Sequence, residues 1–203
     1  MSDLDALSGR LLARLPWVDG LARIAGAQMP VPPPPLTPED CRAVESALGF
    51  ALHPVLRHVY LTVANGGFGS GYGLTGIGPT GFADDNGETA DRRYATDRSP
   101  NPRLPGFDWP EALLPICDFG CAIYHCVDCR SGEVLIWDPT DWTPGHPADR
   151  AIFLTGIDIG TWFDRWSRGE ALDQYLRDPE IVRTSPPGSV TLTASLADRR
   201  AKG

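Results

Sequence analysis

The sequence of 203 residues contains a single lysine, Lys202, next to its C-terminal end. Kinases, P-loop nucleotidases and Schiff-base enzymes all need a lysine inside the fold, either to pair with phosphates or to attack a carbonyl. No lysine lies within residues 1–201, and this absence excludes these activities, although residues 118–120 spell DFG and residues 71–76 fit GxGxxG. The glycine pattern also precedes "IGPTG", which cannot begin the helix that a nucleotide-binding loop requires.

Long apolar runs are also missing, and none approaches the roughly 20 residues that span a bilayer. The first ten residues, "MSDLDALSGR", carry acidic side chains where a signal peptide has basic ones. We therefore expect a cytoplasmic protein that does not bind membranes. The five cysteines are an odd number in a chain without an export signal, which favours a reducing compartment and free thiols.

The sequence offers little for nucleophilic catalysis. Ser70 lies among glycines but lacks the GxSxG spacing. His125 and Cys126 are adjacent, but neighbouring side chains on a regular strand point to opposite faces. We therefore predict no catalytic residue. The four histidines are too dispersed to indicate a triad: His53, His58, His125 and His146.

Basic residues are scarce in the middle of the chain, where most of the net charge of −8 is concentrated. Residues 107–141 carry seven acidic side chains against one arginine, whereas the last 23 residues are basic. An acidic surface repels phosphate and attracts cations, which argues against nucleic-acid binding and for a basic protein partner. The alternative is that scattered acids only keep the protein soluble. The candidate partner-binding residues are Asp108, Asp118, Asp128, Asp138, Asp141 and Trp142.

Helices are predicted in the first half of the chain. Leucines at helical spacing predict an amphipathic helix over residues 4–15. The run "MPVPPPPL" then predicts an extended polyproline connector, with an SH3-type ligand as the alternative. Thr37 can cap a helix over 38–48 that stops at Gly49, and another helix begins near residue 54 and ends at "NGG".

Strands are predicted in the second half, after a glycine-rich loop and a polar stretch over 80–108 with one helix near 88–97. Loops of this length are usually functional or mobile. Strands are expected over 116–120, 121–129 and 133–138, with a hairpin at "RSG", a closing helix over 161–169, a short helix to 176 and a flexible tail from 179.

Four cysteines lie within "CDFGCAIYHCVDC" at residues 117–129. On a regular strand, Cys126 and Cys129 are about 10 Å apart and point to opposite faces, so they lack the tight knuckle of a zinc site. A second CxxC is also absent from the sequence, and we expect buried, inert thiols and no metal. Cys117 and Cys121 flank a turn that could bring them together, which leaves a disulfide, a partial metal site or redox activity open.

Several motifs in order resemble the SUKH superfamily, the bacterial relatives of the fungal cell-wall assembly regulator. They are the capped helix in "LTPEDCRAVESALGFAL", the helix ending in "VANGGFGSGYGLTGIG", the stretch "WPEALLPICDFGCAIYHCVDCRSGEVLIWD" and the closing "IGTWFDRWSRGEAL". Together they cover residues 37–176, and "NGG" is the most specific of them. The residues that the resemblance marks as structural motif positions are Glu45, Gly49, Asn65, Gly66, Gly67, Trp109 and Trp162.

The resemblance implies an α+β fold, with a mostly antiparallel central sheet packed against helices. The corresponding domain would cover residues 37–178, with an N-terminal helix and connector at 1–36 and a C-terminal tail at 179–203. Helices first, strands after and a closing helix agree with this fold class. The resemblance also implies no cofactor and no catalysis.

Many bacterial members of the superfamily look like immunity proteins that neutralise a toxin domain encoded nearby, often a nuclease. An acidic domain can occupy the basic groove that a nuclease uses for phosphates. Low lysine with abundant arginine, alanine and proline is typical of a GC-rich bacterial genome. A regulatory or scaffold protein with another cellular partner is the second hypothesis, and thiol- or metal-dependent activity at the cysteines is the third.

Overall fold

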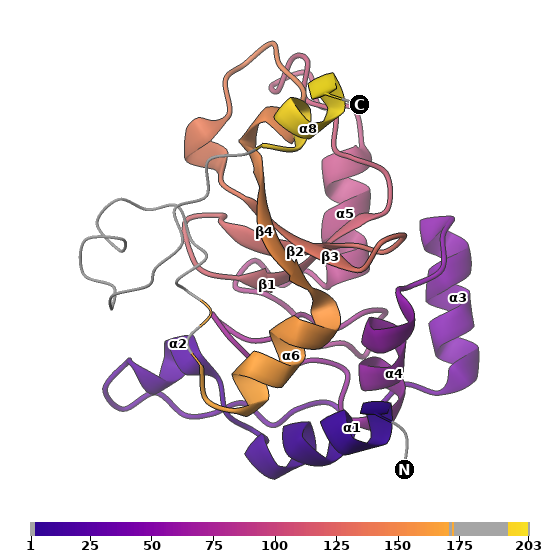
Figure 1. The fold of residues 1–203 in the computed structure, drawn as a ribbon, viewed down its shortest axis with the longest axis vertical. Coiled ribbons are helices and arrows are strands. Elements are labelled where there is room, and N and C mark those ends of the chain that lie inside the picture. The colour runs from indigo at the N-terminus through magenta and orange to yellow at the C-terminus, as the bar shows by residue number, and fades with distance from the viewer. Residues whose placement is uncertain (1–2, 171, 173–194, 203) are drawn as a thin grey trace.

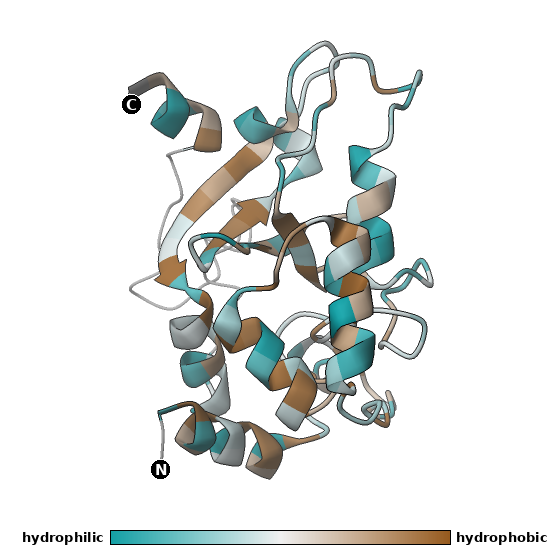
Figure 2. Cartoon of the chain, turned by 90° about the vertical axis from the view of Figure 1, so that its right-hand side faces the viewer, coloured by the Kyte–Doolittle hydropathy of each residue, from teal (hydrophilic) through white to brown (hydrophobic). Residues whose placement is uncertain are grey.

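A four-stranded antiparallel sheet of order β1-β2-β3-β4 lies at the centre of the computed structural model, which describes residues 3–170, 172 and 195–202 (Figure 1). Each strand pairs with the next along the chain, and Figure 2 shows that the strands are largely hydrophobic. The predicted α+β fold with a mostly antiparallel sheet is confirmed. The strands are β1 (Leu113–Asp118), β2 (Tyr124–Asp128), β3 (Glu133–Trp137) and β4 (Ile152–Asp158).

Helices cover both faces of this sheet. On β2, His125 accepts a hydrogen bond from Trp162 of α6, whereas the neighbouring Tyr124 ring lies 5.4 Å from the guanidinium of Arg93 on α5. Consecutive strand residues point to opposite faces, so α5 and α6 lie on opposite sides of the sheet. The described helices are α1 (Asp3–Arg14), α2 (Asp19–Ala22), α3 (Pro38–Leu48), α4 (Pro54–Thr62), α5 (Ala90–Arg98), α6 (Ile159–Ser167) and α8 (Leu196–Lys202), with 3-10 turns η1 (Pro139–Asp141) and η2 (Ala148–Ala151).

The predicted ends of α3 are confirmed. The hydroxyl of Thr37 accepts a hydrogen bond from the N–H of Asp40 at 3.1 Å, which caps the first turn. Gly49 ends the helix in the left-handed conformation, with φ of 81°, and its N–H donates to the carbonyl of Glu45. Both ends depend on residues next to the helix, which is why the sequence alone predicts them.

The N-terminal helix packs into the same core as the rest of the chain. Leu7 and Leu11 of α1 are buried in the main hydrophobic cluster. Arg10 of the same helix pairs with Asp164 of α6, with an N–O distance of 2.6 Å. The helix α1 therefore covers α6 and contributes to the core on that side of the sheet.

Three details of the sheet differ from the sequence-based expectation, the first being that β1 covers Leu113–Asp118 where a strand over 116–120 was expected. The strand expected at 121–129 begins only at Tyr124, because Cys121 and Ala122 have φ of 53° and 59° and form a left-handed turn after β1. The strand β4 was not expected, since its residues do not alternate regularly between apolar and polar and Gly156 lies within it. The strand is buried only in its first half, and the apolar run at that end carries no clear period in its sequence.

The last described residues, 195–202, lie against the sheet. Arg199 of α8 pairs with Glu133 of β3, and Arg200 pairs with Asp149 at 2.9 Å. The remainder of the expected tail, 179–194, lies outside the described residues, as does the expected short helix near 176 except for the buried Leu172. Within the described ranges, no helix combines the length and the apolar character that a membrane crossing requires.

Candidate functional site

The five cysteines are free thiols, and four of them are buried. Burial raises the pKa of Cys117 and Cys126, and it raises the pKa of Cys129 to about 12. Cys121 is exposed on the turn before β2, whereas Cys117 donates its Sγ–H to the carbonyl of Ser70 at 3.0 Å inside the core. Among the described residues, no three His, Cys, Asp or Glu side chains are grouped so that they could hold a metal ion.

Glu45 ties α3 to α4. One carboxylate oxygen accepts a hydrogen bond from the N–H of Leu52 at 3.0 Å and lies 3.4 Å from Nε of Arg57. The left-handed Gly49 turns the chain between Glu45 and both of these partners. The pair Glu45 and Gly49 therefore sets how the two helices follow each other.

Asn65 closes the glycine-rich loop after α4. Its side chain is fully buried, with Nδ2 donating to the carbonyl of Ile77 at 2.8 Å and Oδ1 accepting from the N–H of Ile77 at 2.9 Å. Gly66 has φ of 88°, and a Cβ there would lie 2.5 Å from the carbonyl oxygen of Leu74. Only glycine fits this close backbone approach.

The two motif tryptophans are buried and hydrogen-bonded. The indole N–H of Trp109 donates to the carbonyl of Leu113 at 2.7 Å, and that of Trp162 donates to Nδ1 of His125 at 2.9 Å. Each indole therefore fills the core and satisfies its polar atom. These contacts give both residues a structural role.

The six candidate partner-binding residues do not form one surface. Asp118 and Asp138 are buried, which contradicts the exposure expected of them. Asp118 accepts a hydrogen bond from the N–H of Gly120 at 2.6 Å, and Asp138 accepts one from the N–H of Thr140 at 3.0 Å. Aspartate commonly bonds the backbone two residues further on and so closes a turn. This use removes both carboxylates from the reach of a partner.

The other four candidates lie at or near the surface. Asp108 and Asp141 are exposed, whereas Asp128 and Trp142 are partly buried. Trp142 packs edge-on against Phe107, with 5.5 Å between ring centroids. These residues are therefore accessible in different degrees and come from three parts of the chain: the loop before β1, the end of β2, and η1 with its cap.

A second group of acids, which the sequence did not single out, surrounds Arg93 on α5. The guanidinium of Arg93 lies 3.1 Å from a carboxylate oxygen of Asp84 and 3.0 Å from one of Glu88. Asp84 also accepts hydrogen bonds from the N–H groups of Asn86 and Glu88, which closes the loop. The neighbouring Asp85 is exposed.

Asp97 lies one turn after Arg93 and is partly buried. It forms no hydrogen bond or ion pair with any residue in the described part of the chain. Burial raises the pKa of its carboxyl to about 7, and the nearby carboxylates of Glu88 and Asp84 add to the rise while Arg93 opposes it. Ionised Asp97 is therefore a charge that the protein itself compensates poorly.

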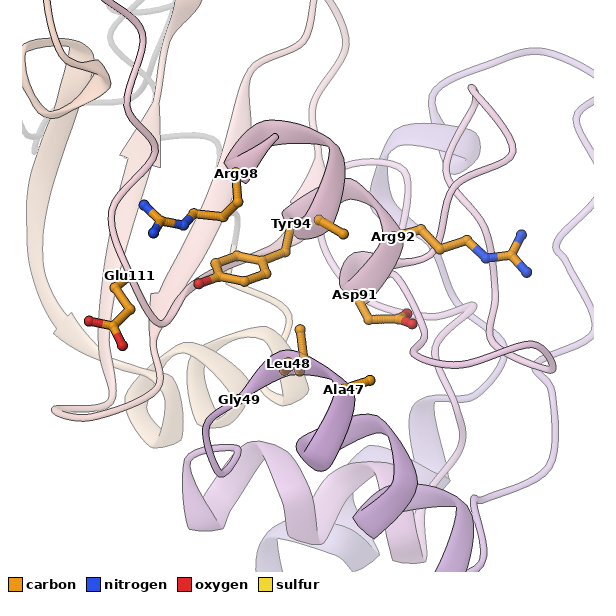
Figure 3. Close-up of a pocket in the computed structure, with 9 residues that line it drawn as sticks. Ala47, Leu48, Gly49, Asp91, Arg92, Tyr94, Arg98 and Glu111 are labelled. Atoms are coloured by element: carbon orange, nitrogen blue, oxygen red, sulfur yellow. The ribbon is translucent and has the colours of Figure 1, made fainter. Parts of the chain in front are cut away.

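A groove of about 490 Å³ lies beside α5, between this helix and the end of α3 (Figure 3). Its apolar lining includes Leu48 and the ring of Tyr94. Figure 3 shows Arg98 and Glu111 at one end of the groove and Arg92 at the other. The groove therefore offers an apolar floor with charged ends of both signs.

We call the acidic loop (residues 84–88), the charged residues of α5 and the groove together the α5 surface; Arg93 of this set faces Tyr124 of the sheet. Asp108 belongs to it because its carboxylate pairs with Arg98 at 3.1 Å. One sequence signal pointed to this surface, the long polar stretch over 80–108. The charged residues of the α5 surface are Asp84, Asp85, Glu88, Asp91, Arg92, Arg93, Asp97, Arg98, Asp108 and Glu111.

Comparisons with known proteins bear on the whole domain. Comparisons with curated proteins and with solved structures found no match. A comparison with protein families matches residues 35–165 to the SMI1 / KNR4 family (SUKH-1). The matched range spans more than half of the chain and contains the sheet, the α5 surface and all seven motif positions. The chain therefore belongs to the SMI1 / KNR4 family (SUKH-1), as its motifs indicated.

Proposed function

We propose that this chain is a non-enzymatic immunity protein that neutralises a bacterial toxin by binding it through the α5 surface. Membership of the family fits an immunity-like or protein-interaction domain, and the family is generally non-catalytic. The observation that carries the proposal is the excess of carboxylates on the α5 surface, where seven acidic residues stand against three arginines and a fourth, Arg130, which pairs with Glu111 at 2.6 Å. A surface with this charge steers and holds a basic partner.

The charge on this surface is available to a partner. Asp84 and Glu88 share the single positive charge of Arg93, whereas Asp85 is exposed and Asp97 forms no ion pair among the described residues. A cationic side chain placed beside Asp97 would stabilise its ionised form, which burial disfavours. Part of the binding free energy would then come from a charge that the free protein compensates poorly.

The groove supplies the second ingredient of a protein interface. Interfaces combine a charged rim with a few apolar or aromatic anchors in a pocket. The volume of about 490 Å³ beside Tyr94 and Leu48 accommodates one such side chain. Asp128, Asp141 and Trp142 are the sequence-derived candidates for the outer edge of the interface.

The proposed partner is a toxin domain encoded near this gene, and a nuclease is the activity that the charge fits best. A nuclease has a basic groove for phosphates, and an acidic domain can occupy that groove and exclude the substrate. The test is to express the C-terminal domain of the neighbouring open reading frame in a heterologous bacterium, with and without this chain. Rescue of growth supports neutralisation, whereas toxicity without rescue contradicts it and favours a regulatory role with another partner.

Charge reversal then tests the surface. The triple variant Asp85→Lys, Asp108→Lys and Glu111→Lys should weaken association with the rescued toxin by roughly tenfold or more at low salt. It should also reduce the dependence of the affinity on salt, because fewer opposite charges meet across the interface. Binding is measured by calorimetry at two ionic strengths.

A matched triple variant controls for net charge. Asp3→Lys, Glu39→Lys and Glu170→Lys make the same change at exposed acids outside the α5 surface. The proposal expects this control to keep nearly the wild-type affinity. Equal losses in the two triple variants would show that only the total charge matters and would contradict a specific α5 surface.

A further inference from the structure

Exposed apolar side chains are concentrated in the N-terminal segment. In the described part of the chain, the large hydrophobic residues that stand out on the surface are Leu12, Trp17, Ile24 and Val31, with exposed fractions from 44% to 91%. All four precede residue 35, where the family match begins. Clustered apolar groups on the surface of a soluble protein usually mark an interaction site.

Part of this segment lines a shallow apolar hollow of about 460 Å³ that is open to solvent. Its walls are Leu15, Pro16, residues 29–35 and residues 63–64. Every one of these side chains is aliphatic, a thioether or a proline ring. The hollow therefore presents no charge and no side-chain hydrogen-bonding group to an occupant.

The polyproline stretch that forms one wall is held in place by the rest of the domain. The carbonyl of Pro33 accepts a hydrogen bond from the N–H of Asn65 at 3.2 Å, and the N–H of Leu36 donates to the carbonyl of Tyr60 at 2.9 Å. Gly67 makes room for this wall, because a Cβ there would lie 3.1 Å from Cα of Pro32. The hollow is thus built on a fixed scaffold and needs little ordering to bind an occupant.

Val31 has an unusual position in this wall. It lines the hollow, yet 91% of it is exposed, so its side chain stands at the rim. One surface therefore carries both a protruding apolar side chain and an apolar recess. A two-fold dimer needs this self-complementarity, because each copy must offer the same patch to the other.

Charge favours a second copy as the occupant. The whole chain carries a net charge of −8, so two copies repel each other over most of their surfaces. Residues 15–36 contain only Asp19 and Arg23 as charged residues, and their charges cancel. A basic partner would gain nothing from this neutral patch, whereas a second acidic chain can approach it.

We propose that the hollow is the interface of a two-fold homodimer in which Val31 of each copy enters the hollow of the other. Figure 1 places α1 and α2 at one end of the long axis and α5 toward the other end. Dimerisation through the N-terminal segment therefore leaves α5 and the groove beside it free, although Phe82, just before the acidic loop, lies next to the wall of the hollow at Gly67. The dimer and the toxin-binding proposal rest on different residues and are tested by different variants.

The test is the mass of the full chain in solution, measured by light scattering and by sedimentation over a wide concentration range. The wild-type chain should be a dimer, and raising the salt concentration should tighten it because the repulsion between acidic chains is screened. Val31→Glu places a carboxylate in the apolar hollow and should raise the dimer dissociation constant by at least about tenfold. Its own fold should be unaffected, because residue 31 is almost fully exposed.

Thr143→Glu is the matched control, since it adds the same charge at an exposed position outside the hollow. The proposal expects this variant to dimerise like the wild-type chain. A wild-type chain that stays monomeric at every concentration overturns the proposal, and so does a dimer that Val31→Glu leaves intact. A monomer that binds a proline- or valine-rich peptide in the hollow would replace the second copy by another occupant.

Discussion

The indole N–H of Trp162 donates a hydrogen bond of 2.9 Å to Nδ1 of His125 inside the core. Since Nδ1 is the acceptor, the imidazole is neutral and carries its proton on Nε2. Burial lowers the pKa of His125 to about 3. The pair joins α6 to β2, and its geometry depends on a histidine that stays neutral.

This histidine should make the protein acid-sensitive. The folded pKa of about 3 lies below the ordinary value of 6.5, so only the unfolded chain takes up this proton between those pH values. Stability should therefore fall as pH drops from about 6.5 toward 3, by at most about 1.4 kcal/mol per pH unit from this group. His125→Leu should flatten this slope by one proton, as measured by urea unfolding across the pH range.

Trp162→Phe is the control for that measurement. It breaks the same hydrogen bond but keeps the histidine. It should therefore lower the free energy of unfolding by about 1 to 3 kcal/mol at neutral pH, while the loss of stability toward acid pH persists. An unchanged slope in His125→Leu would contradict the assignment of the missing proton to His125.

Asp97 should act in the opposite direction. Its folded pKa of about 7 lies above the ordinary value of 3.8, so the folded chain holds this proton more tightly than the unfolded chain does. Stability from this group is complete below about pH 4 and is lost as pH rises toward 7. Asp97→Asn should therefore raise the free energy of unfolding at pH 8 by about 1 to 3 kcal/mol and leave it nearly unchanged at pH 4.

The exposed Asp85 provides the comparison, because Asp85→Asn removes the same charge from a solvated position. Asp85→Asn should change the free energy of unfolding by less than about 0.5 kcal/mol at both pH 4 and pH 8. A gain for Asp97→Asn that is equal at pH 4 and pH 8 would mean that titration of Asp97 is not its cause.

Local signals explain which parts of the fold could be predicted. The α3 helix begins after the Thr37 cap and ends at Gly49, and both ends are determined by residues beside them. The hairpin between β2 and β3 was predicted from "RSG", whose Gly132 has φ of 79°. The β4 strand was missed because it is recognised by pairing with β3, a long-range contact that leaves no period in its own sequence.

The candidate site was harder to predict for the same reason. Asp118 and Asp138 were counted as surface charges, but each closes a turn with its own backbone neighbours. The sequence shows the acid at 84 and the base at 93, but only the folded chain brings Asp84 to Arg93. Counting charges along the chain therefore shows that the protein is acidic, but it does not show where the acidic side chains lie in the fold.

Asn65 should be among the least replaceable side chains of the domain. Asn65→Ala removes both hydrogen bonds to Ile77 and leaves a buried N–H and a buried carbonyl without a side-chain partner. We expect a loss of about 2 to 4 kcal/mol in the free energy of unfolding, measured with urea at neutral pH. Asn86→Ala, in an exposed loop, should change it by less than about 0.5 kcal/mol. Similar losses at the two positions would contradict the role assigned to the "NGG" motif.

Thiol labelling separates packing cysteines from reactive ones. Cys121 is exposed, whereas the other four thiols are buried and burial raises the pKa of Cys117 and Cys126. Thiolates, not thiols, react with disulfide reagents, and a raised pKa makes thiolate scarce at neutral pH. The native protein should therefore react rapidly at one thiol out of five, Cys121→Ser should abolish this reaction, and unfolding should expose the rest. Rapid reaction at a buried thiol, or zinc retained in stoichiometric amount by the purified protein, would instead favour thiol or metal chemistry at residues 117–129.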